Sequence, residues 1–212
     1  MLELGLKVTL AYIAGSVMGA LLIGWFRGGV DIRELGSGNA GGTNALRTQG
    51  RLFALGVMII DVGKGIVAVA LLPPLDIPGI GFDPDVDRAL LRYAIGFAAI
   101  AGHVFPLWHE FRGGKGGATA AGLLCWFAPS LAVPILGLWL LIVFFTGFVG
   151  LATIAAAIGA AVWAGVAWLP ERMPFFVFSS AIAVLIVYTH RGNIVRMRQG
   201  TESRFGRFFG LR

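Results

Sequence analysis

A polar, glycine-rich stretch at residues 36–47 carries the residue types that bind phosphate. It reads Gly-Ser-Gly-Asn-Ala-Gly-Gly-Thr-Asn-Ala-Leu-Arg, so glycines alternate with hydroxyl and amide side chains and an arginine closes the stretch. Glycine lets backbone amides approach an anion closely, and Ser, Thr and Asn side chains add donors. Arginine can bind phosphate in a bidentate manner. The candidate residues are Ser37, Gly38, Asn39, Gly41, Thr43, Asn44 and Arg47.

The same stretch formally matches the dinucleotide fingerprint G-x-G-x-x-G. That reading requires a preceding β-strand, whereas here an apolar run of membrane-spanning length comes first. A flexible linker is the simpler alternative. Two asparagines, a threonine and an arginine at close spacing disfavour it, because Gly/Ser linkers rarely carry that set. We therefore interpret the stretch as an anion-binding loop.

A second glycine-rich stretch surrounds Lys115, with glycines at 113, 114, 116 and 117 just before an expected helix. The free amides of a helix N-terminus and a point charge together suit an anion. It is not a Walker A motif, because both the spacing before Gly-Lys and the following Ser or Thr are missing. His103, at the end of an apolar run, is either functional or a buried structural histidine. The candidates are His103, Gly114, Lys115, Gly116 and Thr119.

A third polar stretch starts at the end of the last apolar run. Its arginines suit a juxtamembrane tail that binds anionic lipid. His190, Asn193 and Glu202 do not fit a purely electrostatic tail, so they indicate a site, to which Ser203 is added.

Two further charges lie inside an apolar run. Asp61 and Lys64 are three residues apart, so they share one face of a helix and can pair. A structural ion pair that lines the bundle is the favoured interpretation, and contact with a substrate is the alternative.

The elements that must position these residues are transmembrane helices. Of the 212 residues, 57% are hydrophobic and 13% charged, where a soluble domain has about 25% charged. The apolar runs are continuous and lack the alternation of barrel strands. We expect an all-α integral membrane protein with about seven transmembrane helices, or five if the short ones are re-entrant. The runs are 3–26, 52–72, 88–108, 118–127, 130–145, 148–169 and 175–189.

Basic residues gather on one side of this arrangement. The loop at 76–87 has four aspartates and no lysine or arginine, whereas the loops and tail on the other side hold twelve of the seventeen basic residues. The positive-inside rule makes that side cytoplasmic, which puts the N-terminus outside and the C-terminus in the cytoplasm. It also explains the net charge of +6 without a nucleic-acid partner. The twelve are Arg27, Arg33, Arg47, Arg51, Arg112, Lys115, Arg191, Arg196, Arg198, Arg204, Arg207 and Arg212.

All three polar stretches then face the cytoplasm. We expect one helical domain over residues 1–212, with active-site loops at 27–51, 102–119 and 189–206. The lone Cys125 can form neither an intramolecular disulfide nor a multi-thiolate metal site.

Together the three stretches resemble the bacterial acyl-phosphate-dependent glycerol-3-phosphate acyltransferase family, the small multi-pass PlsY type. The family pattern is GSGN-x-G-x-TN-x-x-R, then GH-x-FP…F-[KR]-GGKG-x-AT, then HR-x-NI-x-R…G-x-E. All three parts occur in this order. Ala40 stands where the family often has proline, and Gly117 and Gly192 stand where larger residues are common. These departures change loop stiffness and remove no functional group.

The resemblance implies transfer of a fatty acyl group from acyl-phosphate to the sn-1 hydroxyl of glycerol 3-phosphate, which gives lysophosphatidic acid and phosphate. This is the first step of phospholipid synthesis, at the cytoplasmic face of the bacterial inner membrane. The implied partners are the two substrates, membrane lipids and an enzyme that forms acyl-phosphate; no metal or cofactor is implied. Catalysis is assigned to Ser37, Lys115, His190 and Asn193, and binding to the other candidates.

The resemblance also favours direct attack by the acceptor hydroxyl, without a covalent acyl-enzyme. The proton would go to His190, to His103 or to the donor phosphate. The His-x4-Asp pair of other glycerophosphate acyltransferases is absent, since Trp108, Gly114 and Val195 stand five residues after the three histidines.

Two other classes of protein are alternatives. A transporter for a small organic phosphate would also use basic, glycine-rich segments, but its site would lie near the midplane on broken helices. A lipid-binding scaffold would need the basic tail but not His190 or the Asn-Thr-Asn set.

Overall fold

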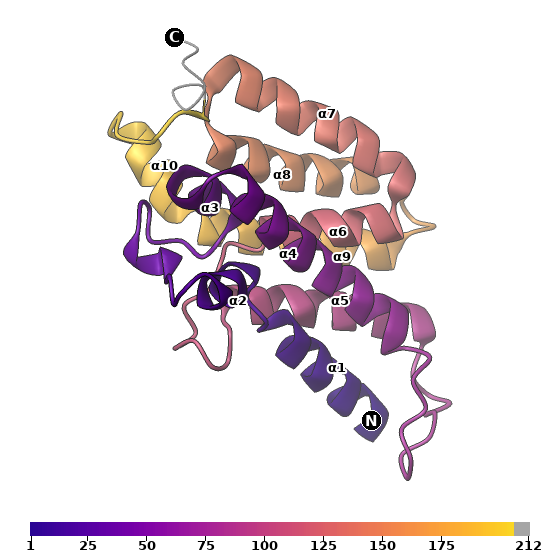
Figure 1. The fold of residues 1–212 in the computed structure, drawn as a ribbon. Helices are drawn as coiled ribbons and strands as arrows, with labels where there is room; N and C mark the ends of the chain where they lie inside the picture. The colour runs from indigo at the N-terminus through magenta and orange to yellow at the C-terminus, as the bar shows by residue number, and fades with distance from the viewer. Residues whose placement is uncertain (206–212) are drawn as a thin grey trace. The chain divides into compact units, whose positions relative to one another are not determined.

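A computed structural model describes residues 1–205, which form helices and loops without a strand among them (Figure 1). Residues 206–212 lie outside this range, and with them the last residue of the predicted loop 189–206, Arg207 and Arg212. The chain divides into two compact units, residues 1–126 and the residues from 127 onward, and each is described by itself.

The first unit contains six α-helices and one short 3-10 helix. Their bounds are α1 Leu2–Gly15, α2 Gly19–Phe26, η1 Ile32–Glu34, α3 Gly42–Gln49, α4 Arg51–Leu71, α5 Arg88–Val104 and α6 Gly117–Phe127. Helix α5 packs along α1, and α4 packs against α2, α3 and α5 (Figure 1).

Glycines bring α1 and α5 into backbone contact. A Cβ atom on Gly15 would lie 2.1 Å from the carbonyl oxygen of Ala99, and one on Gly102 would lie 2.1 Å from that of Tyr12. A Cβ on Gly19 would lie 3.0 Å from the carbonyl oxygen of Val57 on α4. These three glycines therefore lie where helices pack in close backbone contact.

The prediction of one continuous helix over 3–26 is wrong. Helix α1 ends at Gly15, α2 begins at Gly19, and their axes bend by 47°. The freed backbone groups find partners: Lys64 Nζ donates to the carbonyl of Val17 at 2.7 Å, and Asp61 Oδ1 accepts from the amide of Gly19 at 3.2 Å. Such partners are what a broken helix needs in a bilayer. Apolar character alone could not reveal the break, because no proline marks it.

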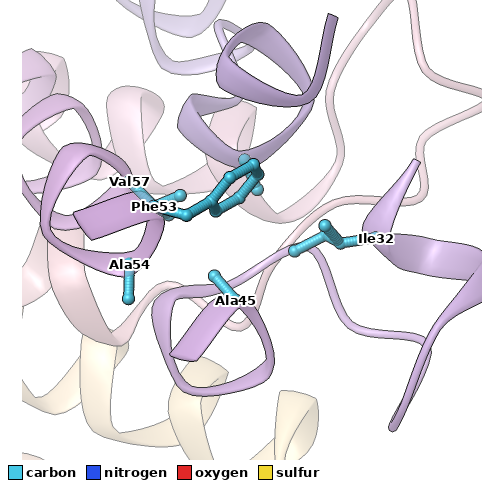
Figure 2. Packing of buried hydrophobic residues seen from close by; sticks show 6 residues of the cluster. Ile32, Ala45, Phe53, Ala54 and Val57 are labelled. Carbon is cyan, nitrogen blue, oxygen red and sulfur yellow. The ribbon is translucent and has the colours of Figure 1, made fainter. Parts of the chain in front are cut away.

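The first polar stretch is more ordered than the predicted loop at 27–51, since it contains η1 and α3. Its anchor is a cluster of buried side chains, in which Phe53 of α4 and Ile32 of η1 point toward one another beside Ala45 of α3 (Figure 2). Phe53 is 2% exposed, and burial of such a side chain contributes about 1.5–3 kcal/mol. The linker alternative therefore does not describe this segment.

The second unit contains the helices α7 Pro129–Thr146, α8 Val149–Ala167, α9 Met173–Thr189 and α10 Arg191–Arg198. Helix α8 packs against α7 and α9, and α10 packs against α8 and α9. The predicted break between α6 and α7 is confirmed, with Pro129 in the first turn of α7, whereas Pro134 lies inside that helix. Helix α10 occupies part of the predicted loop 189–206, at a bend of 52° from α9.

Three helices, α4, α7 and α8, are long and apolar enough to cross a membrane; the bent pairs α1–α2 and α9–α10 raise the number to five. Helix α5 has 17 residues and α6 has 11, where a span needs about 17–25. The all-α membrane class is confirmed. Seven spans, the orientation of the termini and the single-domain organisation stay predictions.

Candidate active site

Asn44 organises the first glycine-rich stretch. Its side chain is buried; Oδ1 accepts from the amide of Ser37 at 2.9 Å, and Nδ2 donates to the carbonyls of Ile32 and Leu35, each at 2.9 Å. Three hydrogen bonds thus hold the loop against the start of α3. Asn44 was predicted to bind substrate, and these contacts show that it also shapes the loop.

Two glycines of this loop have a left-handed backbone, Gly36 with φ +58° and Gly38 with φ +71°. A Cβ on Gly36 would lie 2.4 Å from Oδ1 of Asn44, so the loop cannot keep its path with a larger residue. Ser37 is exposed, and Asn39, Thr43 and Arg47 are half-buried. The first amides of α3 precede its hydrogen-bond ladder, so this end of the helix favours an anion.

The second glycine-rich stretch folds back onto the end of α5. The amide of Gly113 donates to the carbonyl of Val104 at 3.2 Å, and that of Gly114 to the carbonyl of His103 at 3.1 Å. A Cβ on Gly114 would lie 2.1 Å from Nε2 of His103. Lys115 follows, half-buried, and Gly116 has a φ of +85° directly before α6. The lysine is thereby held at a helix start.

His103 belongs to a buried polar cluster with Asp61 and Lys64. The histidine is 2% exposed, and its Nδ1 lies 2.8 Å from Nζ of Lys64 and 3.5 Å from Oδ1 of Asp61. Lys64 and Asp61 form an ion pair at 3.0 Å, which confirms the predicted pairing. This position agrees with the interpretation of His103 as a buried structural histidine.

Thr119 is also fully buried, and its hydroxyl donates to the backbone carbonyl of Asp61 at 2.8 Å. The contact attaches the start of α6 to α4. A role of Thr119 in phosphate binding stays a prediction.

His190 stands at the bend between α9 and α10. It is 5% exposed, and its Nδ1 lies 2.8 Å from the carbonyl oxygen of Ile186. Because a carbonyl can only accept, Nδ1 carries the proton, and Nε2 is the acceptor nitrogen of the neutral ring. The histidine is therefore chemically suited to take a proton.

Glu202 joins the other residues of the third stretch. Its Oε1 accepts from Nδ2 of Asn193 at 2.6 Å, and its Oε2 accepts from Nε of Arg196 at 2.7 Å. The Glu202 side chain is 4% exposed, and Ser203 beside it is exposed. Glu202 thus folds the segment after α10 back onto that helix and orients Asn193.

A further ion pair borders the first stretch. Arg33 binds Asp31 at 2.7 Å and donates to the carbonyl of His109 at 3.1 Å. The Arg33 guanidinium lowers the pKa of Asp31. Partial burial, with Arg33 nearby, lowers the pKa of His109.

A groove of about 500 Å³ adjoins this pair, and none of the predicted site residues lines it. Its lining residues are Val17, Met18, Leu21, Leu22, Trp25, Gly29, Val30, Asp31, Arg33, Trp108 and His109. Within residues 1–205, no three His, Cys, Asp or Glu side chains come together in a way that could hold a metal ion.

Sequence reasoning missed two features of the first unit. The contact between Lys64 and His103 joins residues 39 apart, and only the rarity of charge in apolar runs pointed to it. Glu3 and Lys7, both buried, form a second ionic cluster with the partly exposed Arg88. The spacing of four between Glu3 and Lys7 was its signal.

Comparison with known proteins gives a consistent result. The family model described as glycerol-3-phosphate acyltransferase matches residues 6–200. The glycerol-3-phosphate acyltransferase of Chlorobium phaeobacteroides (strain DSM 266) is 37% identical, with 98% of this chain and 99% of that protein covered. That of Pelodictyon phaeoclathratiforme is 38% identical, with 96% and 97% covered.

Two solved structures are similar over almost the whole chain. PlsY (YgiH), an integral membrane glycerol 3-phosphate acyltransferase, in its glycerol 3-phosphate form is 34% identical, with a TM-score of 0.83 and 98% of each chain covered. Its lysophosphatidic acid form is 33% identical, with a TM-score of 0.80 and 96% and 95% covered. The transporter alternative finds no support in these likenesses. The chain is a membrane enzyme that belongs to the glycerol-3-phosphate acyltransferase family.

Proposed function

We propose that this enzyme transfers a fatty acyl group from acyl-phosphate to the sn-1 hydroxyl of glycerol 3-phosphate, at the cytoplasmic face of the bacterial inner membrane. The observation that carries the proposal is the likeness to PlsY over 98% of the chain. The two solved forms of PlsY are named for glycerol 3-phosphate and lysophosphatidic acid, an acyl acceptor and its acylated product.

The chemistry requires few steps from the protein. The acceptor hydroxyl oxygen forms a bond to the acyl carbon, the bond from that carbon to the phosphate oxygen breaks, and the hydroxyl proton passes to a base. Because acyl-phosphate is already activated, the main task is to hold two phosphate-bearing molecules at the correct distance and angle. The products are lysophosphatidic acid and inorganic phosphate.

In the first unit, the two glycine-rich loops would bind the phosphate groups of the substrates. Lys115 supplies a point charge beside the first amides of α6. Ser37 presents its hydroxyl on a loop that Asn44 holds in place. Such preset donors can stabilise the charge that develops on the acyl oxygen and on the leaving phosphate.

In the second unit, His190 and Asn193 would take part in the same reaction. Nε2 of His190 would take the hydroxyl proton, with the leaving phosphate as the alternative acceptor. Asn193 is oriented by Glu202 and would bind a substrate oxygen. The role of His190 and Asn193 is supported by the charge distribution of the loops, which predicts that all three polar stretches lie on one side of the membrane.

The test is to incubate the purified protein in detergent or vesicles with acyl-phosphate and glycerol 3-phosphate. We expect lysophosphatidic acid and phosphate in equal amounts, without acyl-CoA, acyl carrier protein or added metal. If acyl-CoA alone supported turnover, the proposed donor would be wrong. Counterflow of labelled glycerol 3-phosphate across sealed vesicles without product would instead favour transport.

The site is tested by Ser37→Ala and His190→Ala, for which we expect losses on the order of a hundredfold each in kcat/KM. Full activity of both variants would contradict the assignment of Ser37 and His190 to the active site. Recovery of an acylated side chain after a single turnover would overturn direct transfer.

A further inference from the structure

We propose that Asp61 and Lys64 are positioning residues, which hold both glycine-rich loops of the first unit through one buried network with His103. The inference rests on the proposed function, because that function assigns the substrate phosphates to these loops. Asp61 and Lys64 were predicted to form a structural ion pair. The inference adds that this pair keeps the residues of the site in place.

The protons of the Lys64 ammonium group determine which atoms of the network donate and which accept hydrogen bonds. Its ammonium group contacts three acceptors: the carbonyl of Val17 at 2.7 Å, Oδ1 of Asp61 at 3.0 Å and Nδ1 of His103 at 2.8 Å. An ammonium has three protons and cannot accept. Nδ1 of His103 therefore accepts, and the ring proton lies on Nε2.

The first branch of the network leads to the break between α1 and α2. Lys64 binds a carbonyl just after the C-terminal end of α1, and Asp61 binds the amide of Gly19 at the N-terminal end of α2. Each charge thus has the sign that the adjacent helix end favours. Because α2 packs against η1, this branch supports the segment that leads into the loop around Ser37.

The second branch leads to the loop around Lys115. The ring of His103 is held by Lys64 on its Nδ1 side, while its Nε2 side lies against the backbone of Gly114. On the other side of the loop, Thr119 donates to the carbonyl of Asp61. Lys115 therefore lies between two attachments that both end at residues 61–64 of α4.

Burial of the charged groups of Asp61 and Lys64 costs free energy, which a contact that only stabilises the fold would not require. Asp61 is fully buried, and its Oδ2 has no hydrogen-bond partner within residues 1–205. An apolar contact of the same volume often stabilises a bundle as well as a buried ion pair does. Directional hydrogen bonds that orient the His103 ring and the break between α1 and α2 are something that an apolar contact cannot supply.

The test replaces Lys64 by Met, which keeps much of the volume and removes the three donors. Lys7→Met is the matched control, since Lys7 is also buried in the same unit but its ion-pair partner is Glu3. We expect kcat/KM of Lys64→Met to fall on the order of tenfold to a hundredfold, mainly through the KM for glycerol 3-phosphate. We expect Lys7→Met to keep the KM of the wild type.

A second readout does not use activity. Hydrogen–deuterium exchange of peptides that cover residues 111–118 should become faster in Lys64→Met and stay unchanged in Lys7→Met. An unchanged KM together with unchanged exchange at 111–118 would overturn the inference. A wild-type protein that makes no lysophosphatidic acid would overturn the proposed function, while the exchange result still decides on the network.

If Lys64→Met does not fold, Asp61→Asn and His103→Gln take its place in a double-substitution cycle. Residues that act through one another show non-additive effects. We expect Asp61→Asn to lower kcat/KM clearly less in the His103→Gln background than in the wild type. Additive losses in kcat/KM would contradict the inference that Asp61 acts through His103.

Discussion

The first unit holds two ionic clusters, each of which contains a buried carboxylate and a buried lysine but serves a different purpose. In the Glu3 cluster, Lys7 donates to Glu3 at 2.7 Å and to the carbonyl of Pro73 at 2.9 Å, and Arg88 binds both oxygens of Glu3 at 2.6 and 2.9 Å. The amide of Asp83 adds a donor at 2.8 Å. The Asp61 cluster consists of Asp61, Lys64 and His103.

The difference lies in what each cluster is attached to. The Glu3 cluster joins the first turns of α1 and α5 to the loop before α5 and satisfies its own charges. The Asp61 cluster lies by the other end of α1, about 20 Å from Glu3 at 1.5 Å per residue. It leaves one carboxylate oxygen without a partner within residues 1–205 and contacts the backbone of a glycine-rich loop through His103. We conclude that the first cluster stabilises the fold and the second places the site.

The largest expected effect comes from a methyl group beside His103. Gly114→Ala would put a Cβ 2.1 Å from Nε2 of His103, so the loop or the ring must move. We expect kcat/KM to fall on the order of a hundredfold, because small shifts of a binding loop are costly. The measurement is phosphate release at saturating acyl-phosphate.

Gly63→Ala is the control for this change. A Cβ on Gly63 meets nothing within 4 Å, and alanine is the better helix former by about 1 kcal/mol. Wild-type activity is expected. Equal activity of Gly114→Ala and Gly63→Ala would contradict the contact between the loop and His103.

Lys7→Met should affect stability and not catalysis. It leaves the carbonyl of Pro73 without its buried donor, and a buried group without a partner costs about 1–3 kcal/mol. We expect a lower midpoint of thermal unfolding in detergent with the KM for glycerol 3-phosphate unchanged. A raised KM would remove the distinction between the two clusters.

Glu202→Gln extends the comparison to the second unit. Gln keeps the shape and can still contact Asn193, but it loses the charge that pairs with Arg196 at 2.7 Å. We expect a loss on the order of tenfold in kcat. The substitution weakens the hydrogen bond between residue 202 and Arg196, and a hydrogen bond to a charged group contributes about 1.5–3 kcal/mol. Arg198→Gln, an exposed tail residue, is the control and should keep full kcat.

The smallest effect is expected at the partly exposed ion pair of Asp31 and Arg33. Arg33 lowers the pKa of Asp31 below its ordinary value of 3.8. The pair therefore adds stability above that value and loses it as the pH falls through the lower pKa of the folded state. Asp31→Asn should cost at most about 1 kcal/mol near pH 7.

The measurement for Asp31 is thermal unfolding at pH 7 and pH 3. The difference between wild type and Asp31→Asn should shrink at the lower pH. A difference that grows on acidification would contradict the sign of the shift.

The sequence by itself determined the class of the fold, and it predicts the chemistry of the site. Ser37, Lys115 and His190 lie in local sequence patterns whose hydrogen-bond donors and glycines predict a phosphate-binding site, whatever the fold. The apolar runs required helices in a membrane, and the spacing of Asp61 and Lys64 placed them on one helix face, where the structure pairs them.

Only the tertiary structure decided which polar groups bind one another. The break at residues 16–18 depends on partners from α4, and His103 meets Lys64 from 39 positions away. The structure also shows that Asn44, a predicted substrate-binding residue, holds its own loop. The reason is physical: local spacing fixes which side chains share a helix face, whereas a buried polar group takes whichever partner the packing of distant elements brings to it.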